Sequence, residues 1–317
     1  MRQRVLEEIV AHGGGPGIVV DATSWFGTAG VADVATGRER RAGEHFRIGS
    51  FTKAFTGSVV LLLVAEDVLG LDDTVAKWLP GVVEEHLGGD GELISVRQLL
   101  NHTSGLPDVY PGQEPPRPEE PGKRFVYSKV NYNLAGMIVE SATGSTLAEE
   151  IARRIAEPLG LTGTYLPGED QGLREPHARH YSKFDEAGQD AELHDVTEAD
   201  LSWAGAAGGM VSTTSDLRRF LEALLGGRLL AAAQQEEMFT TVSTEGSEWV
   251  PNTRYGLGVY SQTLASGVTL WGGGGFIQGS MTYAMGDREG TDLLVCNLNG
   301  DWNDFTKTFT ALFEATL

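Results

Sequence analysis

The chain has 317 residues, enough for about two structural units or for one large intertwined unit. Apolar residues make up 41% and charged residues 21%, which suits a buried core under a solvated surface and excludes a chain that is disordered throughout. With 24 basic and 44 acidic residues, the net charge of −20 opposes binding to nucleic acids and to anionic lipid surfaces. We therefore expect no nucleic-acid partner and no membrane association.

The single cysteine, Cys296, excludes an intramolecular disulfide and a multi-cysteine metal site. It ends a short apolar run, so we expect it to pack in the core and not to act as a catalytic thiol. The first residues carry Glu7 and Glu8, where a signal peptide needs an uninterrupted apolar segment. The most apolar stretch, 59–65, is far shorter than the ~20 residues that span a bilayer. If the sequence is complete, these features predict a cytoplasmic protein.

The first part of the chain predicts a short helix, several strands and then one buried helix. Residues 2–11 have apolar side chains at the spacing of a short amphipathic helix, which the glycines that follow would end. Residues 52–68 predict a long helix, and its valines and leucines on all sides indicate that it is buried. The strands predicted between these two helices lie around 18–20, 25–26 and 31–34.

The middle of the chain, about 72–190, is rich in turns. A proline-rich stretch at 113–122 predicts an extended, semi-rigid loop whose role the sequence leaves open. The helices predicted in the middle and just beyond it cover 133–140, 147–155 and 214–225.

The last part of the chain is dominated by strand patterns. Thr213 and Asp216, ahead of the predicted helix at 214–225, resemble a capping box with Asp in place of the usual Glu. The chain closes with a predicted helix that carries Phe305, Phe309, Leu312 and Phe313 on one face. The strands predicted from residue 256 onward cover 258–260, 268–271, 280–285 and 293–298.

Strands at both ends of the chain, with helices between them, predict a mixed α/β fold of the α+β type. One antiparallel sheet would be assembled from the two termini, with the N- and C-terminal helices covering it and a mainly helical part inserted beside it. The predicted division is a single catalytic unit in two lobes. Residues 1–53 and about 191–317 would form the sheet lobe, and about 54–190 the helical lobe. A ligand cleft is expected between the lobes.

The sharpest local feature is the S-x-x-K pattern of Ser50 and Lys53, directly ahead of the buried helix. If that helix begins near Ser50, both side chains lie on one face, with Ser50 at the positive end of the helix dipole. A buried lysine loses pKa through desolvation and can act as a base toward a serine hydroxyl. Taken alone, this common pattern favours an ordinary N-cap serine followed by a lysine in the first turn.

The surrounding sequence changes that interpretation. Residues 46–56, FRIGSFTKAFT, resemble the first motif of class C β-lactamases and related penicillin-binding serine hydrolases. The resemblance runs in order from about residue 17 to 300, and its overall texture is nearest to the D-alanyl-D-alanine carboxypeptidase branch. The further segments that carry it are LDD at 71–73, LPG at 79–81, VRQLLNHTSGL at 96–106, FVYSKVNY at 125–132 and AGGMVSTTSDL at 207–217.

The resemblance implies a β-lactamase/transpeptidase-like fold and an acyl-enzyme mechanism without a metal or an organic cofactor. Ser50 would attack a carbonyl carbon. Lys53 and Tyr127 would form the base and the proton relay, with the phenol oxygen accepting the serine proton. A tyrosine ionises near ~10, so it needs a neighbouring cation to act as a base at neutral pH. The oxyanion would be held by the backbone N–H groups of Ser50 and Phe276.

Two departures from the family pattern change the expected substrate. The Tyr-x-Asn motif ends here in Lys129, which is either a replacement charge at the site or an ordinary solvated lysine. The third motif, His-x-Gly or Lys-Thr-Gly, is replaced by Trp271 and four glycines, so Gly273 stands where the family has its imidazole or cation. That group helps to recognise a carboxylate. Its loss argues against β-lactams and against peptides with a free C-terminus.

The Trp-Gly-Gly sequence is similar to the third motif of the family's esterases and transacylases. The glycines would let a bulky acyl group approach the strand closely; the alternative is a flexible turn between strands. Trp203 and Trp249 fit the wall of a cleft and a packed core equally well. The residues expected to bind substrate are Lys129, Trp271, Gly273, Gly274 and Gly275.

The leading hypothesis is a serine hydrolase or acyltransferase that forms an acyl-Ser50 intermediate on a small ester or amide. It includes a biosynthetic transacylase with an amine or alcohol as acyl acceptor. The alternatives are a D-alanyl-D-alanine carboxypeptidase, a β-lactamase, an amidase specific for D-amino acids that uses Lys129 for recognition, and a non-catalytic ligand-binding descendant. Because few cations are expected at the cleft, a neutral or cationic substrate is favoured. The oligomeric state stays open.

Overall fold

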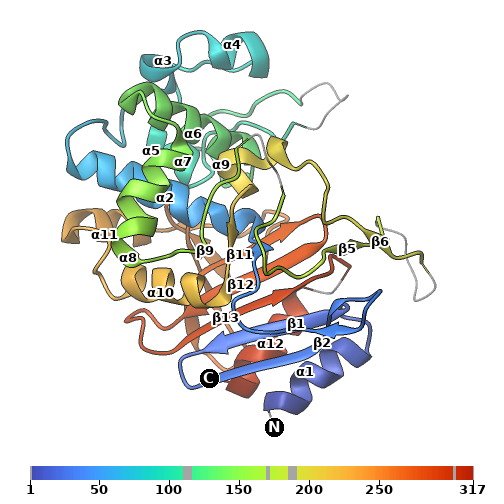
Figure 1. Cartoon of the computed structure of the whole chain (residues 1–317). Coiled ribbons are helices and arrows are strands. Elements are labelled where there is room, and N and C mark those ends of the chain that lie inside the picture. Colours follow the sequence, from blue (N-terminus) through green and yellow to red (C-terminus); the bar gives the residue numbers. More distant parts are fainter. Residues whose placement is uncertain (1, 110–115, 169–171, 185–190, 303–304, 317) are drawn as a thin grey trace.

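The computed structural model describes residues 2–109, 116–168, 172–184, 191–302 and 305–316 (Figure 1). Its strands are β1 (Gly17–Ala22), β2 (Trp25–Asp33), β3 (Arg38–Glu39), β4 (Phe46–Arg47), β5 (Tyr181–Ser182), β6 (His194–Asp195), β7 (Val211–Ser212), β8 (Val242–Ser243), β9 (Thr253–Tyr255), β10 (Tyr260–Thr263), β11 (Thr269–Ile277), β12 (Ser280–Gly286) and β13 (Leu293–Leu298). Its α-helices are α1 (Arg2–Ala11), α2 (Thr52–Ala65), α3 (Val75–Trp78), α4 (Val82–Leu87), α5 (Val96–Leu100), α6 (Lys129–Thr143), α7 (Leu147–Ile151), α8 (Glu157–Leu159), α9 (Gly205–Gly208), α10 (Thr214–Leu225), α11 (Ala232–Phe239) and α12 (Phe305–Thr316). Short 3-10 turns form at η1 (Gly49–Phe51) and η3 (Ser202–Ala204), and a π-helical turn at η2 (Ala152–Ala156).

A nine-stranded antiparallel sheet organises the molecule, in the order β3-β2-β1-β13-β12-β11-β10-β9-β8. β1, near the start of the chain, pairs with β13, near its end, and places Val20 opposite Cys296. Helices α1 and α12 contact each other, and α1 also contacts β2 (Figure 1). The predicted sheet built from both termini, with terminal helices against it, is therefore confirmed.

The central strands alternate between two hydrophobic clusters, as expected for a sheet that is covered on both faces. Ile18 and Val20 of β1 lie in the cluster that includes Leu6 of α1 and Phe313 of α12. Val19, between them, lies in the other cluster, with the residues of α2 and α10. Cys296 is fully buried in the first cluster, and burial raises the pKa of its thiol well above the usual range. Its predicted role in core packing is confirmed.

The buried helix α2 connects the sheet to the helical part of the chain. It contacts α6, α9 and α11, and in Figure 1 the helices α2 to α9 gather on the side of the sheet away from α1 and α12. Phe55 of α2 stacks on Phe220 of α10 with ring centroids 3.8 Å apart. This packing holds the N-terminal part of α2, next to Ser50, against α10, which itself contacts the sheet strands β1, β12 and β13. The exact division into lobes at about 54 and 191 stays a prediction.

The main difference from the predicted elements is in β11. The strand was expected to end at Trp271, but it continues through the four glycines to Ile277. Gly272 to Gly275 lie opposite Met285 to Thr282 of β12, so backbone pairing forms the strand even where glycine has a poor intrinsic strand preference. The alternative interpretation of the glycines as a turn is wrong.

Several helix ends also differ from the prediction. The helix expected at 52–68 ends at Ala65, the one expected from Asn133 begins at Lys129, and the one expected at 147–155 becomes α7 followed by the π-helical turn η2. Helix α11 and the short strands β8 and β9 have no counterpart among the predicted elements. Their patterns are too short to stand out in the sequence.

The predicted capping box of α10 forms only half. The Thr213 hydroxyl accepts the backbone N–H of Asp216 at 3.2 Å. The Asp216 carboxylate does not complete the box; it accepts the N–H of Gly163 at 2.8 Å and the hydroxyl of Thr164 at 3.1 Å. The shorter side chain of Asp thus ties the start of α10 to a neighbouring loop.

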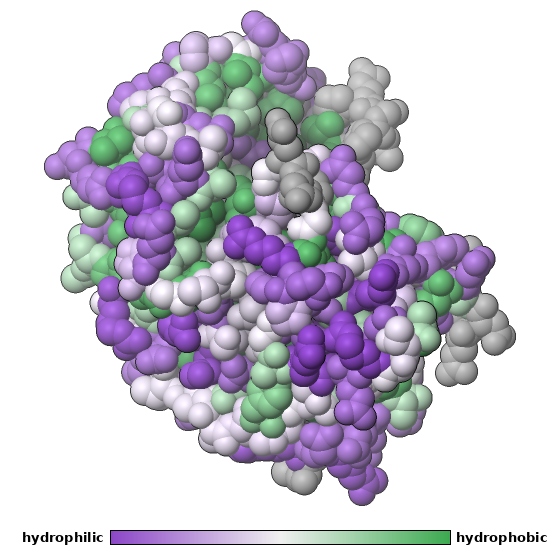
Figure 2. Space-filling view, in the orientation of Figure 1, coloured by the Kyte–Doolittle hydropathy of each residue, from purple (hydrophilic) through white to green (hydrophobic). Residues whose placement is uncertain are grey.

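The surface has the polar character that the composition predicts. Figure 2 shows mostly hydrophilic side chains on the face seen there, with the hydrophobic ones scattered among them. No helix in the described ranges is long and apolar enough to cross a membrane. Residues 113–115 of the predicted proline-rich loop and the side chain of Phe305 lie outside what the structure describes. Phe309, Leu312 and Phe313 are buried, as their spacing predicted.

Candidate active site

The turn that carries Ser50 depends on the glycine before it. Gly49 has a φ of +52°, in the left-handed region that side chains disfavour. A Cβ added to Gly49 would also lie 2.9 Å from backbone atoms of Phe276 in β11. The 3-10 turn η1 then leads directly into α2, and this continuity places Ser50 and Lys53 on one side of the helix end.

The three residues predicted to carry out catalysis lie together. Lys53 Nζ is 3.1 Å from Ser50 Oγ and donates a second hydrogen bond to the carbonyl of Ala207 at 2.7 Å. The Tyr127 hydroxyl donates to Ser50 Oγ at 2.7 Å. Ser50 Oγ is therefore contacted by an amine and a phenol that come from different segments of the chain.

Lys53 has an unusual proton affinity for a lysine. Burial in the protein lowers its pKa to about 7, the Asp108 carboxylate opposes this shift, and the Lys129 ammonium adds to it. Its Nζ also lies 4.8 Å from the ring centroid of Tyr127, so the aromatic ring covers one side of the amine. At neutral pH a large fraction of Lys53 is an uncharged amine, whose lone pair can accept a proton.

Tyr127 is shifted in the opposite sense. Burial raises the pKa of its phenol above the usual value, the hydrogen bond with Ser50 lowers it somewhat, and the Asp108 carboxylate raises it further. The phenol therefore keeps its proton at neutral pH and acts as a hydrogen-bond donor.

A buried histidine, His102, packs against the ring of Tyr127. The His102 ring lies 4.5 Å from the Tyr127 ring, and its Nδ1 faces the backbone N–H of Ser128 at 3.3 Å and the amide nitrogen of Asn131 at 3.0 Å. Because a backbone N–H can only donate, Nδ1 is an acceptor and the ring is neutral. Burial, with the charge of Lys53, holds its pKa well below the usual range.

Ser50 opens onto a cavity of about 490 Å³ with a mixed lining. Among the residues that the structure describes, its charged groups are the carboxylates of Asp108 and Glu248 and the ammonium of Lys129. Lys129 Nζ lies 2.8 Å from the Asp108 carboxylate, which also accepts the Lys129 backbone N–H. The remaining lining residues are Ser50, Tyr127, Trp249, Val250, Tyr260, Gly274 and Phe276.

The glycines of β11 have a different role from the predicted one. A Cβ on Gly275 would lie 1.8 Å from the carbonyl oxygen of Ile48, and one on Gly273 would lie 3.1 Å from the Phe51 ring. These two glycines therefore face the turn around Ser50, and Phe51 fills the space where a longer side chain at 273 would lie. Their absence of side chains lets β11 approach the Ser50 turn, which is a packing requirement and not an opening for a bulky acyl group.

The predicted substrate-binding residues divide accordingly. Lys129 and Gly274 line the cavity. Trp271, Gly273 and Gly275 turn away from it, because they alternate with Gly274 along a strand. Trp271 packs on Phe239, with ring centroids 5.3 Å apart. Phe276, predicted to supply an oxyanion donor, lies beside Gly49 and lines the cavity.

Several cavity residues were missed by sequence reasoning. Asp108 follows directly on the HTSGLP segment, a position that could have marked it as close to the site. Trp249, which the sequence left open, lines the cavity and stacks on Tyr127 with ring centroids 4.3 Å apart. Trp203 is exposed, with Lys129 Nζ 5.9 Å from its ring centroid. Glu248, Val250 and Tyr260 carry no signal in the sequence, because nothing in the pattern near them indicates a shared cavity.

Comparison with known proteins decides the family. Residues 2–316 match the family model described as Beta-lactamase. The chain belongs to the beta-lactamase family. It is accordingly a serine hydrolase of the beta-lactamase and penicillin-binding protein group, which confirms the resemblance and the fold expected from the motifs.

Two solved structures are similar over nearly the whole chain. A D-stereospecific amidohydrolase from Streptomyces sp. is 39% identical, with a TM-score of 0.87, and the match covers 100% of this chain and 98% of that one. The D-amino acid amidase from Ochrobactrum anthropi SV3, complexed with L-phenylalanine amide, is 28% identical, with a TM-score of 0.86, over 99% of this chain and 97% of that one.

Curated relatives in the beta-lactamase family are longer. Penicillin-binding protein 4* of Bacillus subtilis (strain 168) is 28% identical over 72% of this chain and 55% of its own length. A putative D-alanyl-D-alanine carboxypeptidase of Escherichia coli (strain K12) is 29% identical over 73% of this chain and 65% of its own length. The matches thus span between about half and two thirds of these two relatives.

Proposed function

We propose that this protein is an amidohydrolase that cleaves the amide bond of a small D-amino acid derivative through an acyl-Ser50 intermediate. The observation that carries the proposal is the cavity beside Ser50, whose described lining residues include the carboxylates of Asp108 and Glu248 and the ammonium of Lys129. The names of the two similar structures, a D-stereospecific amidohydrolase and a D-amino acid amidase, support the same substrate class.

The charges in the cavity favour a substrate that carries an α-ammonium group. Lys129 is already paired with Asp108, and Glu248 adds a second negative charge. A free ammonium on the substrate is attracted to this pair of carboxylates, whereas a substrate carboxylate is repelled by them. The D-alanyl-D-alanine carboxypeptidase and β-lactamase alternatives both require recognition of a carboxylate, so the cavity disfavours them.

In the first step, uncharged Lys53 accepts the proton of the Ser50 hydroxyl while Ser50 Oγ forms a bond to the substrate carbonyl carbon. The pKa of about 7 for Lys53 and the raised pKa of Tyr127 favour the amine over a phenolate as this base. The carbonyl oxygen becomes an oxyanion. In our proposal the backbone N–H groups of Ser50 and Phe276 stabilise it.

In the second step, the carbon–nitrogen bond breaks and the departing amine takes the Tyr127 proton. Tyr127 suits this role because its hydroxyl is directed at Ser50 Oγ, next to the reacting carbon. The protonated Lys53 nearby restores the phenol proton. Water then hydrolyses the acyl-Ser50 ester by the same groups acting in reverse. An amine or alcohol that enters in place of water would make the same intermediate a donor for acyl transfer.

The test compares the two enantiomers of alanine amide and phenylalanine amide, with ammonia release as the readout. We expect release from the D-amides, little from the L-amides, and none with Ser50→Ala. Intact-mass measurement with a fluorophosphonate should show an adduct on the wild type that Ser50→Ala lacks. Preference for the L-amides, or rapid turnover of nitrocefin without amide cleavage, would contradict the proposal.

A matched pair of variants tests the recognition of the ammonium. Asp108→Asn should raise KM for D-phenylalanine amide about tenfold, in the range of one lost charged contact, and should change KM for its N-acetyl derivative far less. Lys129→Met should lower KM for the same amide, because the Lys129 ammonium then no longer competes with the substrate ammonium for the Asp108 carboxylate. Equal effects on the free and acetylated substrates would mean that Asp108 has only a structural role.

A further inference from the structure

Trp249 occupies a special position beside the proposed proton donor. Its ring is nearly parallel to that of Tyr127, at 4.3 Å and 20°. It also contacts Tyr260 and Phe125, with ring centroids 6.0 Å and 5.9 Å away. The residue is carried by the loop 244–252 between β8 and β9, and not by the sheet itself.

A second cavity also has Trp249 in its lining. It has a volume of about 640 Å³ and shares Asp108, Tyr127, Glu248 and Trp249 with the cavity at Ser50. Tyr260 lines only the Ser50 cavity, and Phe125 lines only the second one. The stacked pair of Trp249 and Tyr127 is therefore a wall that the two cavities share, here called the partition.

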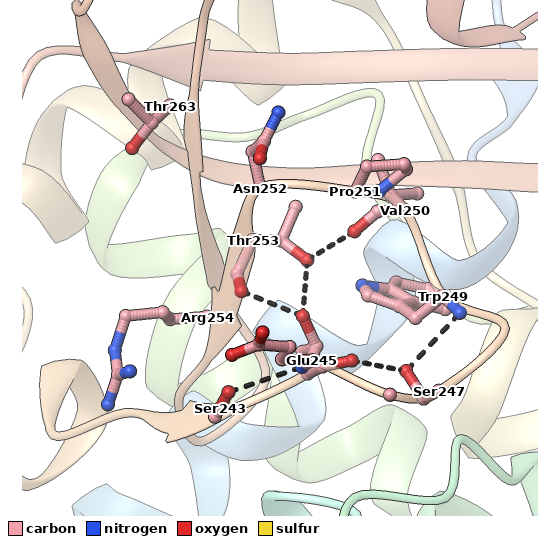
Figure 3. Close-up of a pocket in the computed structure, with 12 residues that line it drawn as sticks. Ser243, Glu245, Ser247, Trp249, Val250, Pro251, Asn252, Thr253, Arg254 and Thr263 are labelled. Carbon is pink, nitrogen blue, oxygen red and sulfur yellow. Dashed lines mark hydrogen bonds between the residues drawn. The ribbon is translucent and has the colours of Figure 1, made fainter.

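The loop that carries Trp249 is held in shape by its own hydrogen bonds (Figure 3). The Ser247 hydroxyl donates to the Thr244 carbonyl at 2.6 Å and accepts the Trp249 backbone N–H at 3.3 Å. The Thr253 hydroxyl donates to the Val250 carbonyl at 2.6 Å. These bonds on both sides of Trp249 fix the backbone that presents the ring, so the partition is part of the folded protein before a substrate binds.

The chemistry indicates which part of the substrate meets the partition. A group that protonates the departing amine must lie within hydrogen-bond reach of it, so the amine leaves from beside the Tyr127 hydroxyl. The wall stacked on Tyr127 is then the wall on the leaving-group side.

We propose that Trp249 determines specificity by limiting the size of the leaving group. With the ring in place, the Ser50 cavity ends at Tyr127 and favours ammonia or another small amine as the leaving group. Without the ring, the two cavities join, and a leaving group as large as an amino acid or an aromatic amine has room. The proposal deepens the proposed function but rests only on its acyl transfer to Ser50, not on the D-amino acid.

The test uses two esters that give the same acetyl-enzyme, methyl acetate and 1-naphthyl acetate, so that only the leaving group differs. The readout is the ratio of kcat/KM for the naphthyl ester to that for the methyl ester. In this ratio, losses of activity that affect both esters equally cancel. Trp249→Ala should raise this ratio at least about tenfold, the scale on which a pocket discriminates by size. Trp249→Phe keeps a ring on Tyr127 and should leave the ratio within about threefold of the wild type.

A ratio that is unchanged in Trp249→Ala would overturn the inference. Circular dichroism checks the fold of each variant, and Trp249→Leu replaces Trp249→Ala if that variant unfolds. If D-alanine amide is cleaved but the ratio does not move, the inference fails and the proposed function stands. If the ratio moves but no D-amide is cleaved, the proposed function fails and the partition stands. Failure of every variant and the wild type to cleave either ester overturns both.

Discussion

The two walls of the cavity beside Ser50 are built in different ways. On one side, β11 lies so close to the Ser50 turn that Gly49 and Gly275 have no room for a Cβ. On the other side, Tyr127, Asp108 and Trp249 meet the cavity through their side chains, by ring stacking and an ion pair. Backbone contact thus positions Ser50, whereas in the proposed function side chains on loops select the substrate.

The largest expected effect comes from a substitution where β11 packs closely against the Ser50 turn. Gly275→Ala places a Cβ 1.8 Å from the Ile48 carbonyl oxygen, so β11 or the Ser50 turn must move. We expect a loss of stability of about 3 kcal/mol and a fall in kcat/KM for methyl acetate of about 10³-fold. Thermal unfolding and ester kinetics measure the two effects. Gly274→Ala, on the cavity side of the same strand, is the control for stability; equal destabilisation by both would break the comparison.

A second prediction concerns the stability that the protein loses by burying Lys53 next to Ser50. Its pKa falls from 10.5 in the unfolded chain to about 7 in the folded protein, so the unfolded state holds more protons between these values. The wild type should therefore gain stability as the pH rises from 7 toward 10.

Lys53→Met removes that titration and should be inactive. Near pH 6.5 it should be more stable than the wild type by a few kcal/mol, about 1.4 kcal/mol for each pKa unit of the shift. The difference should shrink by pH 9.5. Denaturant unfolding at both pH values measures it, and a difference that stays constant with pH would show that Lys53 is not depressed in the folded state.

The pH dependence of the reaction follows from the same group. The base must be unprotonated, so kcat/KM for methyl acetate should rise with pH and level off above about 7, the pKa of Lys53. Below that value the rate should fall about tenfold for each pH unit. A profile over pH 5 to 9 measures this. A rate that stays low up to pH 9 would show that the base is not an amine with a pKa of about 7.

The smallest effect is expected for Phe276, because its backbone N–H and its side chain have different proposed roles. Phe276 is proposed to act through its backbone N–H, and its side chain is 51% exposed. Phe276→Ala should lower kcat/KM for methyl acetate only about threefold, because the N–H remains. A loss as large as that from Gly275→Ala would mean that the side chain, too, positions the nucleophile.

The sequence alone predicted those parts of the molecule that depend on local patterns. Alternating apolar strands at both ends of the chain predicted the sheet in which β1 pairs with β13. The S-x-x-K spacing ahead of a buried helix, with the family resemblance, selected Ser50, Lys53 and Tyr127, and the structure brings their polar atoms within hydrogen-bonding distance.

The parts that were missed depend on contacts between distant segments. The glycines of β11 were interpreted as free space, because the sequence could not show that Phe51 and the Ile48 carbonyl occupy it. Asp108 and Trp249 lie on loops that no periodicity marks, and only the fold brings them to one cavity. A missing side chain in a motif is thus weak information until its neighbours are known.

The pairing of β1 with β13 has a consequence for how the protein folds. β1 gains its central partner only after β13 has been synthesised, and the Ser50 turn likewise waits for β11. Contacts of such long sequence separation slow folding, and until they form β1 exposes an unpaired strand edge. We expect the nascent chain to depend on chaperones until its last strand emerges, and activity to appear in a single late step.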